Sequence, residues 1–354
     1  MGGFALPDEL RLALAFALAF GAALVTVPLA IRVAWRTDFL DRPVGYKKHA
    51  RPTPYLGGVA VMLAFLPASL LLGGGASQFG VIVLCALGLS LVGAVDDRVG
   101  LGPLPRVLAE IAAATALWSA GLAWFVSESE TVNLLVAIVW VVGVVNAFNL
   151  MDNLDGAAGT VGAVSAAGAG ALAAIEGDPV LAALALSLAG ACAGFLPFNL
   201  DRPARIFLGD GGSMPVGFVV AAVVMGISEH AGLGQAAVVA AALFVGLPAL
   251  DTALVVVSRT RRGAAVLSGA RDHLTHRLLG PLRTPRAVAL ALGLIQALLC
   301  VVGLALFETP AAGVFVFGAM YFLLGSAAIL VLDSSYSPDA APGLAAPARQ
   351  EPGP

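Results

Sequence analysis

NAFNLMDNLDG, residues 146–156, stands between two long apolar runs that cover residues 131–145 and 157–175. Its polar side chains recur at every third position, as Asn146, Asn149, Asp152 and Asp155. At 3.6 residues per turn this spacing drifts by about 60° per step, so the four side chains cannot share one face of a straight helix. We therefore expect a helix that ends near Leu150, with the two amides on its last turn and the two carboxylates in a loop closed by Gly156.

The chemistry of this stretch leaves two interpretations open. Carboxylate and amide oxygens that converge without a basic partner favour a hard divalent cation, Mg²⁺ first. Asn and Asp are also common in solvated turns, which is the alternative. The rest of the chain has to decide between them.

The composition of the chain indicates a polytopic membrane protein. Hydrophobic residues make up 59% of the 354 residues and charged residues only 12%, whereas a soluble domain carries about 25% charged residues. The three cysteines lie inside apolar runs without a CxxC pair, so we interpret them as small buried hydrophobes: Cys85, Cys192 and Cys300.

With about 20 apolar residues per span, the sequence predicts an all-α fold of about 11 transmembrane helices. The expected spans are Leu10–Val33, Leu56–Leu72, Phe79–Val95, Leu104–Phe125, Val132–Leu150, Ala157–Ile175, Val180–Pro197, Ser213–Ile227, Gln235–Val257, Ala287–Phe307 and Ala312–Leu332. We expect one catalytic membrane domain over residues 1–333 and a disordered, proline-rich cytoplasmic tail over residues 334–354.

The connections between these spans alternate between basic and acidic. Of all the Lys and Arg residues, only Arg11 belongs to the acidic set, which includes Glu128, Glu176 and Glu229. By the positive-inside rule the basic set faces the cytoplasm, which places the N-terminus outside and the C-terminus inside.

Polar chemistry gathers in the connections of the cytoplasmic set. Residues 41–58 hold a cation cluster of Lys47, Lys48, His49 and Arg51, which suits a phosphate or, alternatively, the anionic lipid leaflet. Gly57 and Gly58, which follow two prolines, would admit a close approach of another backbone segment.

The pair Asp96–Asp97 closes the third expected span. Adjacent carboxylates at a membrane boundary repel each other unless a cation neutralises them. A metal ion is the interpretation we favour, and Arg98 is the alternative cation.

FLGDGGSMPVG, residues 207–217, predicts a helix start at which Ser213 is the N-cap and Pro215 lies in the first turn. Glycines beside a helix N-terminus present N–H groups to an anion, and Asp210 could hold a metal there. A plain glycine-rich turn is the alternative.

RDHLTHR, residues 271–277, carries two of the four histidines beside arginines. His273, His276 and Arg277 together suit a diphosphate, with a solvated loop as the alternative. Two acids inside apolar runs have simpler interpretations: Glu110 can pair with Arg106 along its helix, and Asp251 can face the bundle interior.

These five segments together resemble the polyprenyl-phosphate N-acetylhexosamine-1-phosphate transferases, a superfamily shared with the phospho-N-acetylmuramoyl-pentapeptide transferases. The resemblance covers about residues 10–332, with the motifs in the family's order. The residues that match are Asp41, Pro43, Lys47, His49, Pro52, Pro54, Gly57 and Gly58, then Asp96 and Asp97, then Asn146, Asn149, Asp152, Asp155 and Gly156, then Gly209, Asp210, Gly212 and Ser213, and finally His273, His276 and Arg277. Two positions depart from the pattern: Tyr46 stands where Arg is usual, and Thr275 replaces the middle His of the last motif.

The resemblance implies transfer of a sugar 1-phosphate, with GlcNAc first, from a UDP-sugar to undecaprenyl or another polyprenyl phosphate at the bacterial inner membrane. It implies a Mg²⁺ cofactor, with Mn²⁺ as a substitute, and no nucleic acid partner; a homodimer is a further expectation. The implied catalytic residues are Lys47, Asp96, Asp97 and Asp210, of which the three aspartates hold the metal. The implied substrate-binding residues are Lys48, His49, Asn146, Asn149, Asp152, Asp155, Gly212, Ser213, His273, His276 and Arg277. The alternatives are muramoyl-pentapeptide phosphate transfer and, in a different class, an ion-coupled transporter.

Overall fold

The computed structural model describes residues 7–42, 51–72, 77–228, 235–266 and 270–334. Lys47, Lys48 and His49 therefore lie outside the described residues, as does nearly all of the expected tail. The described part holds one short strand pair, β1 (Leu40–Asp41) with β2 (Thr53–Pro54), and its other regular elements are helices. The helices are α1 (Asp8–Thr37), α2 (Gly57–Leu72), α3 (Ser77–Val99), α4 (Pro103–Ser119), α5 (Glu130–Met151), α6 (Ala157–Ile175), α7 (Pro179–Asn199), α8 (Asp210–Ser228), α9 (Gln235–Ala242), the 3₁₀ turn η1 (Leu243–Val245), α10 (Gly246–Arg261), α11 (Leu274–Leu282), α12 (Pro285–Phe307) and α13 (Ala311–Ser334).

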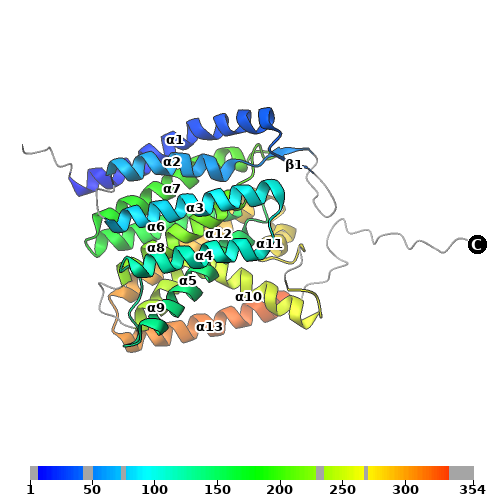
Figure 1. Cartoon of the computed structure of the whole chain (residues 1–354). Helices are drawn as coiled ribbons and strands as arrows, with labels where there is room; N and C mark the ends of the chain where they lie inside the picture. Colours follow the sequence, from blue (N-terminus) through cyan, green and yellow to red (C-terminus); the bar gives the residue numbers. More distant parts are fainter. Residues whose placement is uncertain (1–6, 43–50, 73–76, 229–234, 267–269, 335–354) are drawn as a thin grey trace, which may run out of the picture.

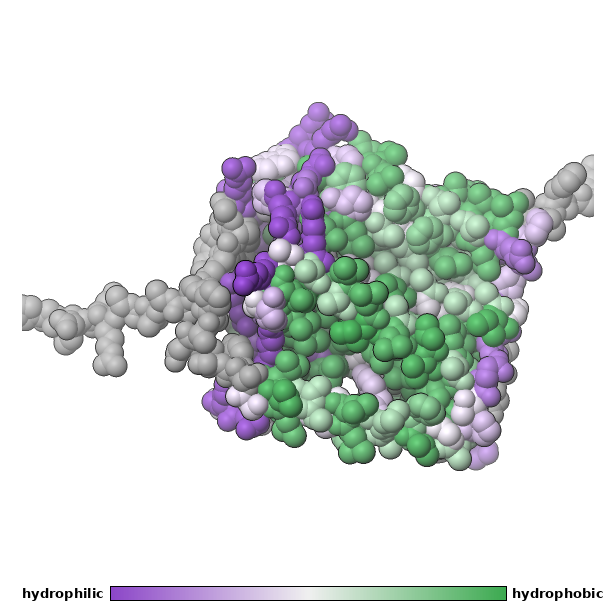
Figure 2. All heavy atoms as spheres, turned by 180° about the vertical axis from the view of Figure 1, so that it is seen from behind, coloured by the Kyte–Doolittle hydropathy of each residue, from purple (hydrophilic) through white to green (hydrophobic). Residues whose placement is uncertain are grey.

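The predicted all-α membrane fold is confirmed. Among the described residues, nine helical segments are long and apolar enough to cross a membrane. Each of the other two expected spans also contains a helix, but α2 has 16 residues and α4 has 17. Figure 1 shows the long helices running roughly alongside one another, and Figure 2 shows a broad apolar surface between two hydrophilic ends.

Two expected spans differ from the structure in their course. The span expected to reach Phe125 ends as a helix at Ser119, followed by Gly121 at φ 75°. The span expected over 235–257 is divided by η1, where the side chain of Gln296 donates to the carbonyls of Leu243 and Phe244 at 3.1 and 2.9 Å. A helix can break inside the membrane where a side chain donates hydrogen bonds to the backbone carbonyls that the break leaves unpaired. The apolar pattern of the sequence alone does not reveal such a break. One helix, α11, was not expected at all.

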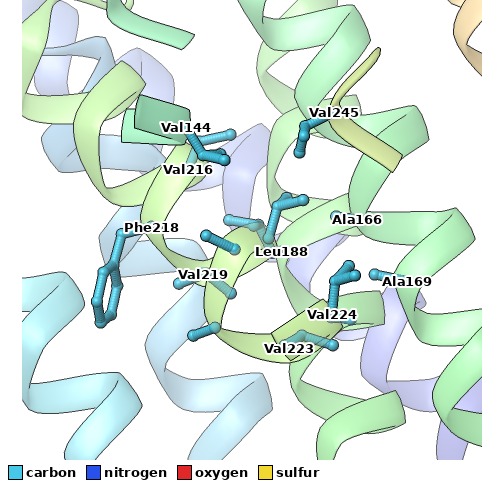
Figure 3. Close-up of a cluster of buried hydrophobic side chains, with 14 of the residues drawn as sticks. Val144, Ala166, Ala169, Leu188, Val216, Phe218, Val219, Val223, Val224 and Val245 are labelled. Carbon is cyan, nitrogen blue, oxygen red and sulfur yellow. The ribbon is translucent and has the colours of Figure 1, made fainter. Parts of the chain in front are cut away.

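Helix α8 is the centre of the bundle. It packs against α3, α5 and α6, and 94% of its apolar stretch is buried. Figure 3 shows Val216, Phe218, Val219, Val223 and Val224 of α8 among apolar side chains of the neighbouring helices. This part of α8 is thus apolar on every side, as expected for a helix enclosed by others.

The predicted close approach at Gly57 and Gly58 is confirmed. The N–H groups of these glycines donate to the carbonyls of Phe207 and Leu208 at 3.1 and 2.8 Å. A Cβ on Gly58 would lie 2.0 Å from the nitrogen of Gly212. The start of α2 is therefore fixed directly against the loop that leads into α8.

Candidate functional site

The site is built around the first residue of α8, Asp210. The preceding Gly209 has φ 70°, which a residue with a side chain rarely adopts. Asp97, at the end of α3, accepts the N–H groups of Asp210 and Gly211 at 2.9 and 3.0 Å. The expectation that Ser213 caps this helix is wrong, because α8 begins three residues earlier and its first N–H groups are bonded by a carboxylate from another helix.

The NAFNLMDNLDG stretch supplies a second support for the same loop. As predicted, α5 ends at Met151 and Gly156 closes the turn with φ 81°. Asp152 then accepts the N–H of Gly209 at 3.0 Å. Asn199 accepts the N–H of Gly156 at 2.6 Å, which ties the turn to the end of α7. The carboxylate-bearing turn therefore lies directly against the start of α8.

The side chain of Asp210 joins three helices. Its Oδ1 accepts from Asn149 of α5 at 2.7 Å, and Asn149 also contacts the hydroxyl of Ser213 at 3.1 Å. Its Oδ2 accepts from Arg106 of α4, and the same guanidinium nitrogen lies 2.9 Å from Oδ2 of Asp96. Four residues predicted for the site therefore lie together: Asp96, Asn149, Asp210 and Ser213. Arg106 joins them, and the sequence interpretation had not assigned it to the site.

Arg106 has partners beyond the one expected from sequence. Its charge acts on Glu110, as the i, i+4 spacing predicts, but its hydrogen bonds go to Asp96 and Asp210. Glu110 instead accepts from the amide of Asn146 at 2.6 Å. Arg98, the cation considered from sequence, donates to the carbonyl of Asp38. One sequence signal could have indicated this role for Arg106. It is an arginine near the start of an apolar helix, on the same predicted side of the membrane as the acidic residues that end or follow two other helices.

The oxygen-rich donor set fits a divalent cation. Within the described part of the chain, Oδ1 of Asp96 is buried and has no hydrogen-bond partner, which is costly for a carboxylate oxygen unless a ligand meets it. Among the described residues, no three His, Cys, Asp or Glu side chains form a preorganised metal cluster. Mg²⁺ does not require one, because it is often held by one or two carboxylates together with substrate phosphates.

The electrostatics of the site follow from burial. Burial, and then the neighbouring charge of Asp210, raises the pKa of Asp152 to about 7. Burial, and then the charges of Asp97 and Asp210, raises the pKa of Tyr55 far above its ordinary value. The protein thus gathers acidic groups in a poorly solvated place, where a bound cation would stabilise their ionised forms.

The predicted residues of the late motif lie on and before α11, an amphipathic helix. His273 has Nδ1 2.9 Å from Oδ2 of Asp251, which is fully buried in α10 as expected. Burial, and then the charges of Arg271 and His273, lowers the pKa of His276 to about 4. Arg277 donates to the carbonyl of Asp272 and to the hydroxyl of Ser258, both at 2.9 Å.

A contact between two loops connects the late motif to the central stretch. Thr275, which is fully buried, donates its hydroxyl to Oδ1 of Asn153. Asn153 follows Asp152, whose carboxylate supports Gly209. Thr275 therefore joins the two motifs at the position where the family pattern has a histidine.

Asp155 lies beside a small hollow in the same region. The hollow has a volume of about 180 Å³. Its lining residues are Asp155, Leu200, Asp201, Arg202, Pro203, Pro285 and Arg286. The structure thus places Asp155 next to two arginines, in a hollow that none of the residues bonded to Asp210 lines.

A bundle of membrane-length helices with a carboxylate cluster at one end of its central helix is a polytopic membrane protein. Residues 79–228 match glycosyl transferase family 4. The chain is 31% identical over 293 residues to the decaprenyl-phosphate N-acetylglucosaminephosphotransferase of Mycobacterium leprae, over 70% of this chain and 71% of that one. The chain belongs to glycosyl transferase family 4.

Further similarities cover two branches of the family. The enzyme of the same name from Mycolicibacterium smegmatis is 32% identical over 276 residues, which is 65% of this chain and 66% of that one. A phospho-N-acetylmuramoyl-pentapeptide-transferase from Mycolicibacterium gilvum is 31% identical over 356 residues, 84% of this chain and 97% of that one. The chain thus spans about two thirds of the length of the first kind of relative.

Proposed function

We propose that this protein transfers N-acetylglucosamine 1-phosphate from UDP-GlcNAc to a polyprenyl phosphate, undecaprenyl or decaprenyl, and releases UMP. The names of the M. leprae and M. smegmatis relatives support this choice of sugar and lipid. The observation that carries the proposal is the cluster in which Asp96, Asp210 and Arg106 meet at the start of α8. The proposed location is the bacterial inner membrane, with the cluster on the cytoplasmic side.

The reaction joins two anions, so charge neutralisation is its main requirement. A polyprenyl phosphate has a second pKa near about 6 and is largely ionised at neutral pH, which makes it a nucleophile without a strong base. When bound, Mg²⁺ would shield the diphosphate of the donor, held by Asp210 and Asp96, with Asp97 at its side. Arg106 would contribute a second positive charge at the same place.

The role of Asp97 follows from its two hydrogen bonds. Both of its carboxylate oxygens accept N–H groups of the first turn of α8. Asp97 therefore orients Asp210, and each oxygen keeps a lone pair that a metal ion could share. Its place among the metal ligands stays a prediction.

The remaining predicted residues would bind the two substrates. Asn149 and Asp152 would shape the pocket beside Asp210, and Asp155 would line its edge. His273 and His276 would meet the donor diphosphate and sugar from α11. Lys47, with Lys48 and His49 beside it, remains our proposal for the group that binds the lipid phosphate.

The second candidate is transfer of a phospho-N-acetylmuramoyl-pentapeptide, which the long alignment to the M. gilvum relative favours. The two reactions share the lipid phosphate and the UMP product and differ in the sugar. Since the chain belongs to a transferase family, we do not propose ion-coupled transport. A homodimer remains a prediction.

The test is UMP release by the purified protein in detergent with polyprenyl phosphate, Mg²⁺ and UDP-GlcNAc. We expect UMP that requires the lipid and disappears with EDTA, and Mn²⁺ should restore part of the rate. Asp210→Asn should lose at least about 10²-fold in kcat. UMP only with UDP-MurNAc-pentapeptide would establish the second candidate, and no UMP with either donor would contradict both.

A further inference from the structure

Arg277, which the sequence assigned to the donor diphosphate, directs its guanidinium at groups of the protein. Its Nε donates to the carbonyl of Asp272, and one terminal nitrogen donates to the hydroxyl of Ser258, both at 2.9 Å. The other terminal nitrogen donates to the carbonyl of Leu332. Only 5% of the side chain is exposed. A diphosphate would therefore have to compete with charge-assisted hydrogen bonds that the protein already makes.

The bond to Leu332 closes the end of the last membrane helix. Leu332 lies in the final turn of α13, where the last four carbonyls have no partner within the helix. A positive side chain at this position also meets the negative end of the helix dipole. Arg277 thus acts as a C-terminal cap of α13, although it belongs to α11.

The bond to Ser258 attaches the same guanidinium to the end of α10. Ser258 is fully buried in the last turn of that helix, so no substrate reaches it. The next residue, Arg259, donates twice to the carboxylate of Asp272, at 3.0 and 2.8 Å. A bidentate ion pair of this kind fixes both distance and orientation. The start of α11 is therefore joined to α10 twice, through Asp272 and through Arg277.

The other side of α11 contacts the turn that follows α5. Thr275 and Arg277 are two residues apart, so their side chains point about 200° apart around the helix. Thr275 is fully buried and donates its hydroxyl to Asn153, whose amide donates to the carbonyl of Leu150. Asp152, the residue before Asn153, supports the loop that leads into α8. Helix α11 thus lies between the ends of α10 and α13 on one side and this turn on the other.

We propose that Arg277 is a positioning residue and not a ligand of the donor. It holds α11 against the ends of α10 and α13, so that Thr275 keeps its bond to Asn153. Its effect reaches the cluster at Asp210 through that bond and the turn that contains Asp152. This proposal rests on the proposed function for the reaction that is measured and not for the bonds of Arg277.

The first test is independent of activity. In protein labelled with ¹⁵N-arginine, Arg277→Lys identifies the signal of the Arg277 side chain among the arginines. We expect its Nε–H to exchange with water at least about tenfold more slowly than that of the exposed Arg283, because it is buried and bonded. The slow exchange should be present both without and with UDP-GlcNAc and Mg²⁺. An Nε–H that is protected only after the nucleotide is added would overturn the proposal, since a ligand of the donor behaves in that way.

The second test measures UMP release. Arg277→Gln should lower kcat by about tenfold or more, because a displaced α11 no longer supports the turn beside the cluster. Arg277→Lys should be no better, since lysine lacks the planar fork that reaches several partners at once. A ligand of the diphosphate would give another result, because lysine keeps the charge and binds phosphate. Recovery of both kcat and the KM for UDP-GlcNAc in Arg277→Lys would therefore overturn the proposal.

A double-mutant cycle tests whether Arg277 acts through Thr275. Thr275→Val removes the hydroxyl that bonds to Asn153 and keeps a branched side chain in the same place. If the two residues act through one contact, Arg277→Gln should lower kcat less in the Thr275→Val protein than in the wild type. The same loss in both backgrounds would show that Arg277 does not act through this contact.

Arg283→Gln is the matched control, because Arg283 is the exposed C-cap residue of the same helix. It should retain activity within about twofold, as expected for a surface change. If wild-type protein releases no UMP with any donor while the Arg277 signal exchanges slowly, the proposed function fails and the placement of Arg277 stands.

If Arg277→Gln does not fold, Ser258→Ala takes its place in the kinetic test. It removes one bond of Arg277 from a residue that no substrate reaches, and it should lower kcat in the same direction. A Ser258→Ala protein with the kcat of the wild type would then contradict the positioning role.

Discussion

The single residue that changes the interpretation of this site most is Arg106. It connects Asp96 of α3 with Asp210 of α8, although it lies on α4. In sequence it is separated from Asp96 by the turn of residues 100–102, so the pairing depends on the angle between two helices. Local spacing cannot supply that angle, and the sequence interpretation therefore assigned Arg106 to Glu110.

Arg106→Gln should reduce the rate of UMP release by about 10²-fold or more, because a half-buried positive charge beside Asp96 and Asp210 is removed. Arg98→Gln is the control, since Arg98 contacts Asp38 and the ring of Phe39 outside the cluster. We expect the control to retain activity within about threefold. Equal losses in the two variants would show that Arg106 has no special role.

The titration of His276 gives a prediction about stability. Its pKa in the folded protein is about 4, against about 6.5 for an ordinary histidine. The folded state therefore binds this proton less tightly than the unfolded chain, and the stability from His276 is intact above about pH 6.5 and is lost as the pH falls toward 4.

We expect the midpoint of thermal unfolding in detergent to fall over that interval in the wild type and to fall less in His276→Gln. The measurement compares the pH dependence of the two midpoints rather than their absolute values. Parallel curves for the two proteins would contradict the prediction.

At the scale of elements, sequence predicted much of what positions the site. The end of α5 near Leu150, the turn closed by Gly156 and the approach of Gly57 and Gly58 are all confirmed. Each of these features depends on a residue's own conformational preferences. The predicted start of α8 was wrong because the carboxylate that caps this helix belongs to Asp97 on another helix. Local sequence rules cannot detect such a partner.

The contact between α3 and the start of α8 can be tested with two glycines of α3. A Cβ on Gly93 would lie 2.3 Å from the carbonyl oxygen of Asp210, whereas a Cβ on Gly88 would have no atom within 4 Å. Gly93→Ala should destabilise the protein by about 1–3 kcal/mol and lower activity, because it separates two packed backbones. Gly88→Ala should be neutral or slightly stabilising, since Ala favours helix.

Thermal unfolding and UMP release of the two alanine variants check this prediction together. A Gly93→Ala protein as stable and active as Gly88→Ala would mean that α3 and α8 do not touch as described.

At the scale of the whole molecule, the positive-inside pattern gives an orientation that can be measured. The turn after α6 holds Glu176 and should lie outside, whereas the turn after α7 holds Asp201 and should lie in the cytoplasm. In a variant without the three native cysteines, Glu176→Cys should react with an impermeant maleimide in intact cells. Asp201→Cys should react only after the membrane is opened, and the reverse pattern would place the cluster at Asp210 outside.

The last membrane helix has a consequence for protein engineering. Arg277 donates to the carbonyl of Leu332, and Arg261 pairs with Asp333, so the end of α13 is attached to the helices that carry Asp251 and the late motif. A purification tag or fluorescent protein joined after Ser334 leaves these bonds in place. A fusion joined before Leu332 removes both bonds, and α11, which carries His276, loses a support. The apolar sequence of α13 alone does not indicate that its end is bonded to α10 and α11.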